Sequence, residues 1–246
     1  MQLYDSIIRD AQERLFQRAA RRYAYAAQRA WKDSGESELI MQRETAFELG
    51  GDGKPAVNYS CVTSDASLVD RDEVVVIGKD LSEISSSVPF ARLAFILIDD
   101  LEPADGDTEP LFRAIQDIDF VKYHVFPEGY MVRTSAESHR EQVRISKKAK
   151  AAGISFERVG CDYIRRYKED PHIRAVKLVF VTDPQVDYKK LAEEAKTAHD
   201  ITLTLSKILE GMPTDCNSCN LKPICDEVEG MKELHFGQNK PEFKGM

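Results

Sequence analysis

The sequence has no run of about eighteen consecutive apolar residues, which is the length that a helix needs to cross a bilayer. Charged residues at Asp5, Arg9 and Asp10 interrupt its first segment, where a secretory signal peptide has an apolar core. The net charge of −8 argues against general binding to nucleic acids. We therefore expect a cytoplasmic protein that binds neither membranes nor nucleic acids.

Familiar catalytic motifs are also missing. The sequence has no glycine-rich phosphate loop and no Gly-x-Ser-x-Gly turn, so it gives no sign of a nucleotide hydrolase or a serine hydrolase. Its 246 residues suffice for a core without disulfides, and its five cysteines, an odd number, fit a reducing compartment better than a disulfide framework. Whether the chain is an enzyme stays open.

Apolar side chains recur at helical spacing over residues 3–32 and predict a long N-terminal helix. Arginines lie between the apolar positions, and we interpret them as a solvated face. The sequence Asp33-Ser-Gly-Glu-Ser37 ends the helix. Residues 1–37 are thus expected to form a helical arm, whose alanine-rich stripe would suit a homo-oligomeric contact.

Residues 38–210 are predicted to form an α/β domain, a layered mixed sheet with flanking helices. Apolar runs predict strands over residues 74–77, 92–98, 120–126 and 175–181. Helical patterns between and after them cover residues 109–118, 138–151, 157–168, 188–199 and 199–209. Gly153 is well placed to end the second of these helices.

The last segment, residues 211–246, is expected to bind a metal. Cys216, Cys219 and Cys225 lie close together, and thiolates at two-residue spacing converge readily on one ion or cluster. Iron–sulfur and structural zinc sites both use such a pair, so the spacing leaves the metal open. His235 would supply a fourth ligand, the alternative being a surface histidine. Cys61 and Cys161 are interpreted as buried small hydrophobic residues.

Positive charge is concentrated between residues 133 and 150 of this acidic chain. Arg140, Arg144 and Lys147 are candidates for an anion site, because guanidinium groups offer planar forks that match phosphate. The alternative is the solvated face of a helix, and the composition favours it.

Several passages occur in the order found in one known family. Val143-Arg-Ile-Ser-Lys147, the strand Val176–Asp183 and the pair Cys216-x2-Cys219 resemble passages of carbon-monoxide-dependent acetyl-CoA synthase, the β subunit of the acetyl-CoA decarbonylase/synthase complex. Upstream, Thr45–Leu49 and Val74–Ile77 are similar in the same order, so the resemblance spans roughly residues 45–237. None of these motifs is specific alone; their common order carries the resemblance.

The resemblance implies the family's middle domain followed by the start of its iron–sulfur motif. It implies a 4Fe-4S cluster on Cys216, Cys219 and Cys225, with His235 standing where the family has its fourth cysteine. It also implies coenzyme A phosphates as the anion, with Arg144 as the leading contact, and carbon monoxide dehydrogenase, corrinoid-protein machinery or another redox protein as partner.

The departures from the family limit its activity in this chain. The family holds nickel in part through a Cys-Gly-Cys motif, and this sequence has no Cys-x-Cys. The large C-terminal catalytic domain is missing as well, so nickel and complete acetyl-CoA synthesis are not expected. Two functions stay open: an accessory, electron-transfer or metal-handling iron–sulfur protein of anaerobic one-carbon metabolism, and a zinc-stabilised binding module or complex subunit without catalysis.

Overall fold

Two β-sheets organise the protein in the computed structural model, which describes residues 2–99, 109–135, 139–209, 222–228 and 231. The larger sheet is mixed and has the strand order β1-β4-β8-β5-β3. Its strands are β1 (Ala20–Ala24), β3 (Ala56–Thr63), β4 (Glu73–Ile77), β5 (Phe90–Ile98) and β8 (Ile173–Val181). The smaller sheet is antiparallel, with the order β2-β7-β6, and comprises β2 (Thr45–Leu49), β6 (Tyr130–Ser135) and β7 (Arg140–Ser146).

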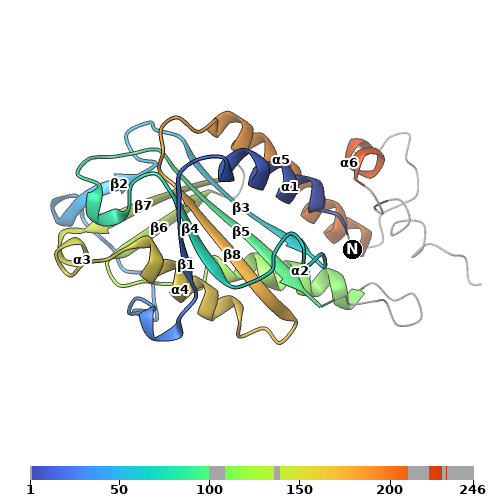
Figure 1. The fold of residues 1–246 in the computed structure, drawn as a ribbon, viewed down its shortest axis with the longest axis horizontal. Coiled ribbons are helices and arrows are strands. Elements are labelled where there is room, and N and C mark those ends of the chain that lie inside the picture. The colour runs from blue at the N-terminus through green and yellow to red at the C-terminus, as the bar shows by residue number, and fades with distance from the viewer. Residues whose placement is uncertain (1, 100–108, 136–138, 210–221, 229–230, 232–246) are drawn as a thin grey trace, which may run out of the picture.

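Helices cover both faces of the larger sheet (Figure 1). They are α1 (Asp5–Phe16), α2 (Glu109–Val121), α3 (Lys147–Ala151), α4 (Phe156–Tyr167), α5 (Tyr188–Leu209) and α6 (Lys222–Glu227). Helices α1 and α5 lie together on one face, while α4 packs on β4 and β8 from the other. The smaller sheet lies beside α4 and contacts β3 and β5. This is the predicted α/β architecture of a mixed sheet with flanking helices and a helix at the N-terminus.

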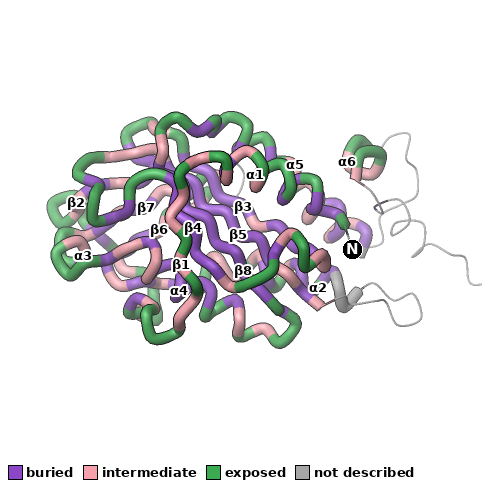
Figure 2. The backbone as a smooth tube through the Cα atoms, in the orientation of Figure 1, coloured by how far each residue is buried: buried purple, intermediate pink, exposed green. Residues whose placement is uncertain are grey.

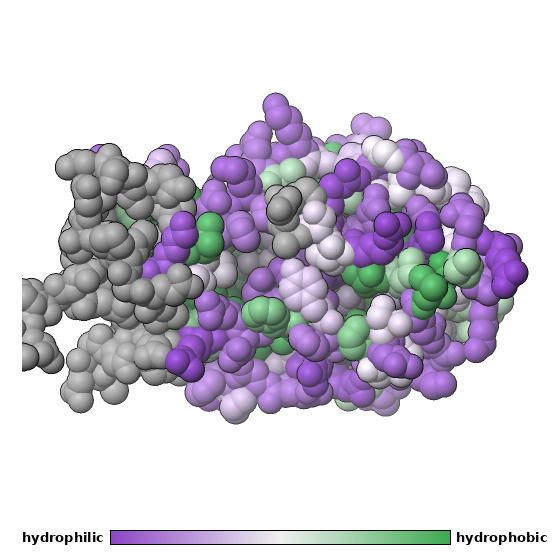
Figure 3. Space-filling view, turned by 180° about the vertical axis from the view of Figure 1, so that it is seen from behind, coloured by the Kyte–Doolittle hydropathy of each residue, from purple (hydrophilic) through white to green (hydrophobic). Residues whose placement is uncertain are grey.

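The central strands are buried on both faces, as Figure 2 shows. Every residue of β4 is buried, and so is all of β8 except Arg174. Strands covered by helices on both sides read as continuous apolar runs, which is why the sequence indicated them clearly. Seen from behind, the surface is mainly hydrophilic with scattered hydrophobic residues (Figure 3). Among the described residues, no helix is long and apolar enough to span a membrane.

Gly153 ends α3 in the predicted manner. Its φ of +80° lies in the left-handed region that glycine adopts without steric cost. The Gly153 N–H donates to the Lys150 carbonyl and the Ile154 N–H to the Ala149 carbonyl, both at 3.1 Å. These two bonds make the Schellman arrangement, which satisfies carbonyls at the end of a helix.

The predicted helix over residues 3–32 is correct only for Asp5–Phe16. Residues 20–24 form β1 instead, which pairs antiparallel with β4 and completes that edge of the larger sheet. The apolar stripe of α1 is buried in the chain's own core and leaves no apolar face for a second copy. The arginines are also engaged, because Arg14 pairs with Glu194, Arg18 with Asp183, Arg21 with Glu83 and Arg22 with Glu73.

Two further segments differ from the prediction. Residues 140–146 form a strand rather than helix, with Glu141, Val143 and Ile145 buried and their neighbours less so. Only α3 remains of the helix predicted over 138–151. The strand predicted over 120–126 is the end of α2 and the loop after it, because α2 continues to Val121. The two helices predicted between 188 and 209 are one helix, α5.

Candidate functional site

The described part of the cysteine-rich segment 211–246, residues 222–228 and 231, packs against the body. Ile224, Cys225 and Val228 are partly buried and pack against the core, and Met231 is fully buried. Helix α6 contacts α5. Cys216, Cys219 and His235 lie outside the described residues. The proposed ligand set therefore remains a prediction, with Cys225 fixed beside the core.

Cys61 and Cys161 have the predicted place in the core. Both side chains are completely buried, Cys61 on β3 and Cys161 on α4. Burial raises the pKa of both thiols, because a thiolate is poorly solvated there. They are packing residues rather than metal ligands in this fold.

The candidate anion residues lie on or just after β7, and each already donates a hydrogen bond to another described residue. Arg144 Nε donates to Glu48 Oε1 at 2.6 Å, and Lys147 Nζ donates to the Arg43 carbonyl at 2.8 Å. Arg140 is exposed, and its nearest acceptor is the Lys54 carbonyl at 3.4 Å. None of the three lines a cavity described below, so their role as an anion site stays a prediction.

A buried ion pair lies between the larger sheet, α4 and the smaller sheet. Arg92 of β5 is 1% exposed and Glu141 of β7 is fully buried. The guanidinium makes two hydrogen bonds to the carboxylate, at 2.7 Å from Nε and 2.5 Å from Nη2. The Asn58 amide also donates to Glu141 Oε2. Such a bidentate pair offsets part of the large desolvation cost of two buried charges.

Tyrosines surround this pair, and several of their hydroxyls have no hydrogen bond from the described residues. The Arg92 guanidinium lies 4.4 Å from the centre of the Tyr163 ring, a cation–π contact. The hydroxyls of Tyr130 and Tyr163 and the carbonyl oxygen of Asn58 are buried and unpartnered among the described residues. Burial raises the pKa of both tyrosines, so both stay neutral. A buried polar group without a partner is costly and indicates a place for water or a ligand.

Two cavities open beside this polar cluster and meet at Lys122. The larger has a volume of about 240 Å³ and is lined by apolar and aromatic residues together with Tyr130, Glu38 and Thr134. The smaller has about 30 Å³ and is mainly polar, with a lining that includes Asn58, Ser60, Asp119, His139 and His199. Lys122 donates to Asp119 at 2.7 Å. This region is the main candidate for a binding site in the described body.

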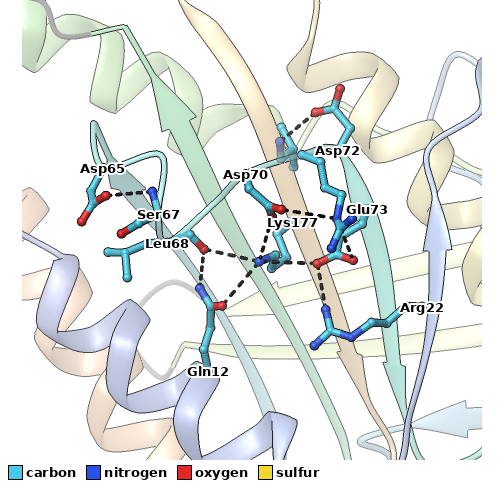
Figure 4. Close-up of polar contacts among 11 residues, drawn as sticks. Gln12, Arg22, Asp65, Ser67, Leu68, Asp70, Asp72, Glu73 and Lys177 are labelled. Carbon is cyan, nitrogen blue, oxygen red and sulfur yellow. Dashed lines mark hydrogen bonds and ion pairs between the residues drawn. The ribbon is translucent and has the colours of Figure 1, made fainter.

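A second charged cluster lies at the other side of the larger sheet, and its charged groups pair with one another (Figure 4). The buried ammonium of Lys177 lies 3.4 Å from Glu73, 3.7 Å from Asp70 and 3.3 Å from the Leu68 carbonyl. Arg22 reaches the same Glu73 carboxylate at 2.9 Å. The cluster ties β1, β4 and β8 to the loop before β4, and we interpret it as structural.

Asp162 of α4 is a completely buried carboxyl whose Oδ2 is unpartnered among the described residues. Desolvation raises its pKa to about 6, although Arg165 donates to its Oδ1. The unfolded chain would ionise this group near its usual value of 3.8. Between these values the folded state binds more protons, so the contribution of Asp162 is favourable at low pH and is lost as the pH rises to 6.

We expect Asp162→Asn to remove this pH dependence. The free energy of unfolding of the wild type, relative to the variant, should fall by up to about 3 kcal/mol between pH 4 and pH 7, at about 1.36 kcal/mol per pKa unit. Urea unfolding at both pH values measures it, with the exposed Asp10→Asn as the control. A constant difference between wild type and Asp162→Asn would contradict the prediction.

Sequence reasoning missed the buried pair and the cavities, although one signal was present. Arg92 opens an otherwise apolar run, and a charge in a buried strand requires a partner. Its partner Glu141 lay in a segment predicted as helix, so the pairing was not visible. His139 and His199 come from distant parts of the chain and gave no sequence signal.

Comparison with known protein families matches residues 31–186 to the CO dehydrogenase/acetyl-CoA synthase complex beta subunit. The match covers more than half of the chain and includes the smaller sheet, α4 and all of the larger sheet except β1. It ends before α5, so it does not reach the cysteine-rich segment. No curated protein matches the chain.

Proposed function

Since the chain belongs to the family of the CO dehydrogenase/acetyl-CoA synthase complex beta subunit, we propose that it is an accessory iron–sulfur protein of anaerobic one-carbon metabolism. In this role it transfers electrons or handles metal for carbon monoxide dehydrogenase or for corrinoid-protein machinery in the cytoplasm. It does not synthesise acetyl-CoA by itself. No nickel site is proposed, because the sequence has no Cys-x-Cys to hold one.

The observation that carries the proposal is the Cys-x2-Cys-x5-Cys spacing of Cys216, Cys219 and Cys225, which follows the family domain after helix α5. Three thiolates so close in sequence suit one cubane cluster. Helix α6 supports this, because it holds Cys225 against the core and so gives the cluster a fixed place on the body. His235 is proposed as the fourth ligand.

A cluster in this segment supplies a one-electron centre, and the residues around it set its properties. The three thiolates bind iron, and a histidine in place of the fourth thiolate donates less charge, as in Rieske centres, where histidine raises the potential. Cys225 is partly buried against the core, so it would shield a bound cluster from solvent on that side.

We also propose that Arg140, Arg144 and Lys147 bind an anionic group, with coenzyme A phosphate as the candidate. Arg140 and Lys147 are both exposed, and Arg140 has only a long hydrogen bond of 3.4 Å to the Lys54 carbonyl. Arg144 would have to exchange Glu48 for the phosphate, because that carboxylate now accepts from its Nε. Lys147 begins α3 directly after β7, at the opposite end of this central strand from Arg140, so an extended anion would be needed to reach both.

A zinc-stabilised binding module is the alternative function. The docking of α6 favours it equally, because one zinc ion on three cysteines and a histidine would fix a short segment to a partner-binding body. In that case the protein would be a complex subunit without redox chemistry.

Metal and sulfide content of protein purified without oxygen decides between the two. We expect about four irons and four sulfides per chain, the stoichiometry of a cubane, with a broad visible absorption. One zinc per chain and no sulfide would refute the iron–sulfur role and establish the structural zinc site.

A further inference from the structure

His139 and His199 lie close together in the lining of the smaller cavity. Their ring centres are 4.7 Å apart and the rings are tilted by 47°. His139 lies directly before β7 and has a positive φ of +48°. His199 lies on α5. The main chain of His139 is fixed, because its carbonyl accepts the Asn58 N–H at 2.9 Å.

This spacing matches two imidazoles on one metal ion. With metal–nitrogen bonds of about 2.0–2.1 Å, ring centres lie about 4.5 to 5.2 Å apart for ligand angles between roughly 90° and 109°. The observed 4.7 Å falls in this interval. The tilt of 47° also shows that the two rings are not stacked in parallel.

The charges around the two histidines leave their imidazoles able to bind a cation. Metal binding requires neutral imidazoles, so positive charge facing the two rings would oppose it. Lys122 is paired with Asp119 at 2.7 Å, and Asp200 with Lys196 at 3.2 Å. No uncompensated positive charge from these described residues faces the pair.

Asn58 lines the same cavity as the two rings and offers an amide oxygen there, beside the Ser60 hydroxyl and the Lys122 ammonium. Asn58 is only 4% exposed, and its Oδ1 is unpartnered among the described residues while its Nδ2 donates to Glu141. If the Asn58 amide were flipped, its Oδ1 would face the Glu141 carboxylate and the two oxygens would repel each other. Oδ1 therefore points away from Glu141. At about 30 Å³ the cavity holds one ion with a water, since one water needs about 10–15 Å³.

We propose that His139 and His199 bind a divalent first-row transition-metal ion of the Co²⁺ to Zn²⁺ group, with Asn58 Oδ1 and water as oxygen ligands. Imidazole suits these borderline ions. No group of three His, Cys, Asp or Glu side chains with metal-site geometry occurs among the described residues, so this is a two-histidine site with open positions. It is separate from the cysteine-rich segment and does not depend on the metal bound there.

Equilibrium dialysis of the full chain against Co²⁺, with the metal of the cysteine-rich segment in place, tests the site. We expect one additional Co²⁺ per chain, and an affinity lowered at least about tenfold in His139→Gln and His199→Gln. His124→Gln and His172→Gln are matched controls, because both histidines are exposed and neither lines the cavity. Unchanged affinity in the first two variants, or equal losses in all four, would overturn the proposal.

X-ray absorption at the cobalt edge tests the site on the wild-type chain alone, so it does not depend on whether the variants fold. The wild-type chain with one additional Co²⁺ should show outer-shell scattering from two imidazole rings. A shell of oxygen alone, or of sulfur from the cysteine-rich segment, would overturn the proposal.

Discussion

Glu141→Leu is expected to lower the free energy of unfolding by about 3 to 5 kcal/mol. The change removes the only carboxylate that pairs with Arg92 among the described residues and leaves a guanidinium that is 1% exposed. Water cannot reach the stranded charge without opening the contact between the two sheets. The Asn58 amide loses its acceptor at the same time. Urea unfolding at constant pH measures the loss.

A second ion pair, between Arg144 of β7 and Glu48 of β2, provides the matched control. Arg144 and Glu48 also form a close hydrogen-bonded pair, but each side chain is 22% exposed, so water replaces the lost partner. Glu48→Leu should therefore cost less than about 1 kcal/mol. Equal losses from Glu48→Leu and Glu141→Leu would contradict a special role for burial.

The double variant Arg92→Met/Glu141→Leu separates the net value of the pair from the cost of breaking it. Two apolar side chains of similar volume remove both charges, so no stranded guanidinium remains, and most of the lost stability should return. If the double variant loses as much as the two single variants together, the two side chains contribute independently, and the stranded charge does not explain the loss in Glu141→Leu.

The parts of the fold that the sequence predicted are those in which local pattern and tertiary position agree. The continuous apolar runs of β4, β5 and β8 are buried on both faces, and Gly153 ends α3 where its left-handed φ is needed. For these features the physical cause is contained within a few neighbouring residues.

The errors arise where a distant partner decides the structure. Residues 20–24 carry a helix-compatible pattern, yet pairing with the edge of β4 makes them a strand. Strand β7 has basic residues typical of a helix surface, but hydrogen bonds to β2 and β6 and the pairing of Glu141 with Arg92 set its conformation. The two-histidine site depends on the same long-range arrangement, because α5 brings His199 to the start of β7.

Cys216→Ser and Cys219→Ser are expected to abolish the iron–sulfur cluster, lowering iron from about four per chain to near zero. A serine hydroxyl is a much harder and weaker ligand for iron than a thiolate, so the remaining ligands cannot hold the cubane. Cys225→Ser should have the same effect, although its position on the partly buried α6 also makes it part of the packing. Iron and sulfide analysis with visible spectra of protein prepared without oxygen measures the loss.

Cys61→Ala and Cys161→Ala are the controls, because both thiols are completely buried in the core and should leave the iron content unchanged. His235→Ala separates a ligand from a surface residue: loss of one iron or of the cluster's stability to air indicates ligation, since the fourth iron then has no protein ligand. If Cys216→Ser and Cys219→Ser retain four irons, the cluster is held elsewhere and the proposed ligand set is wrong. The family domain would then have to supply the ligands, although Cys61 and Cys161, the two cysteines within residues 31–186, are both buried in its core.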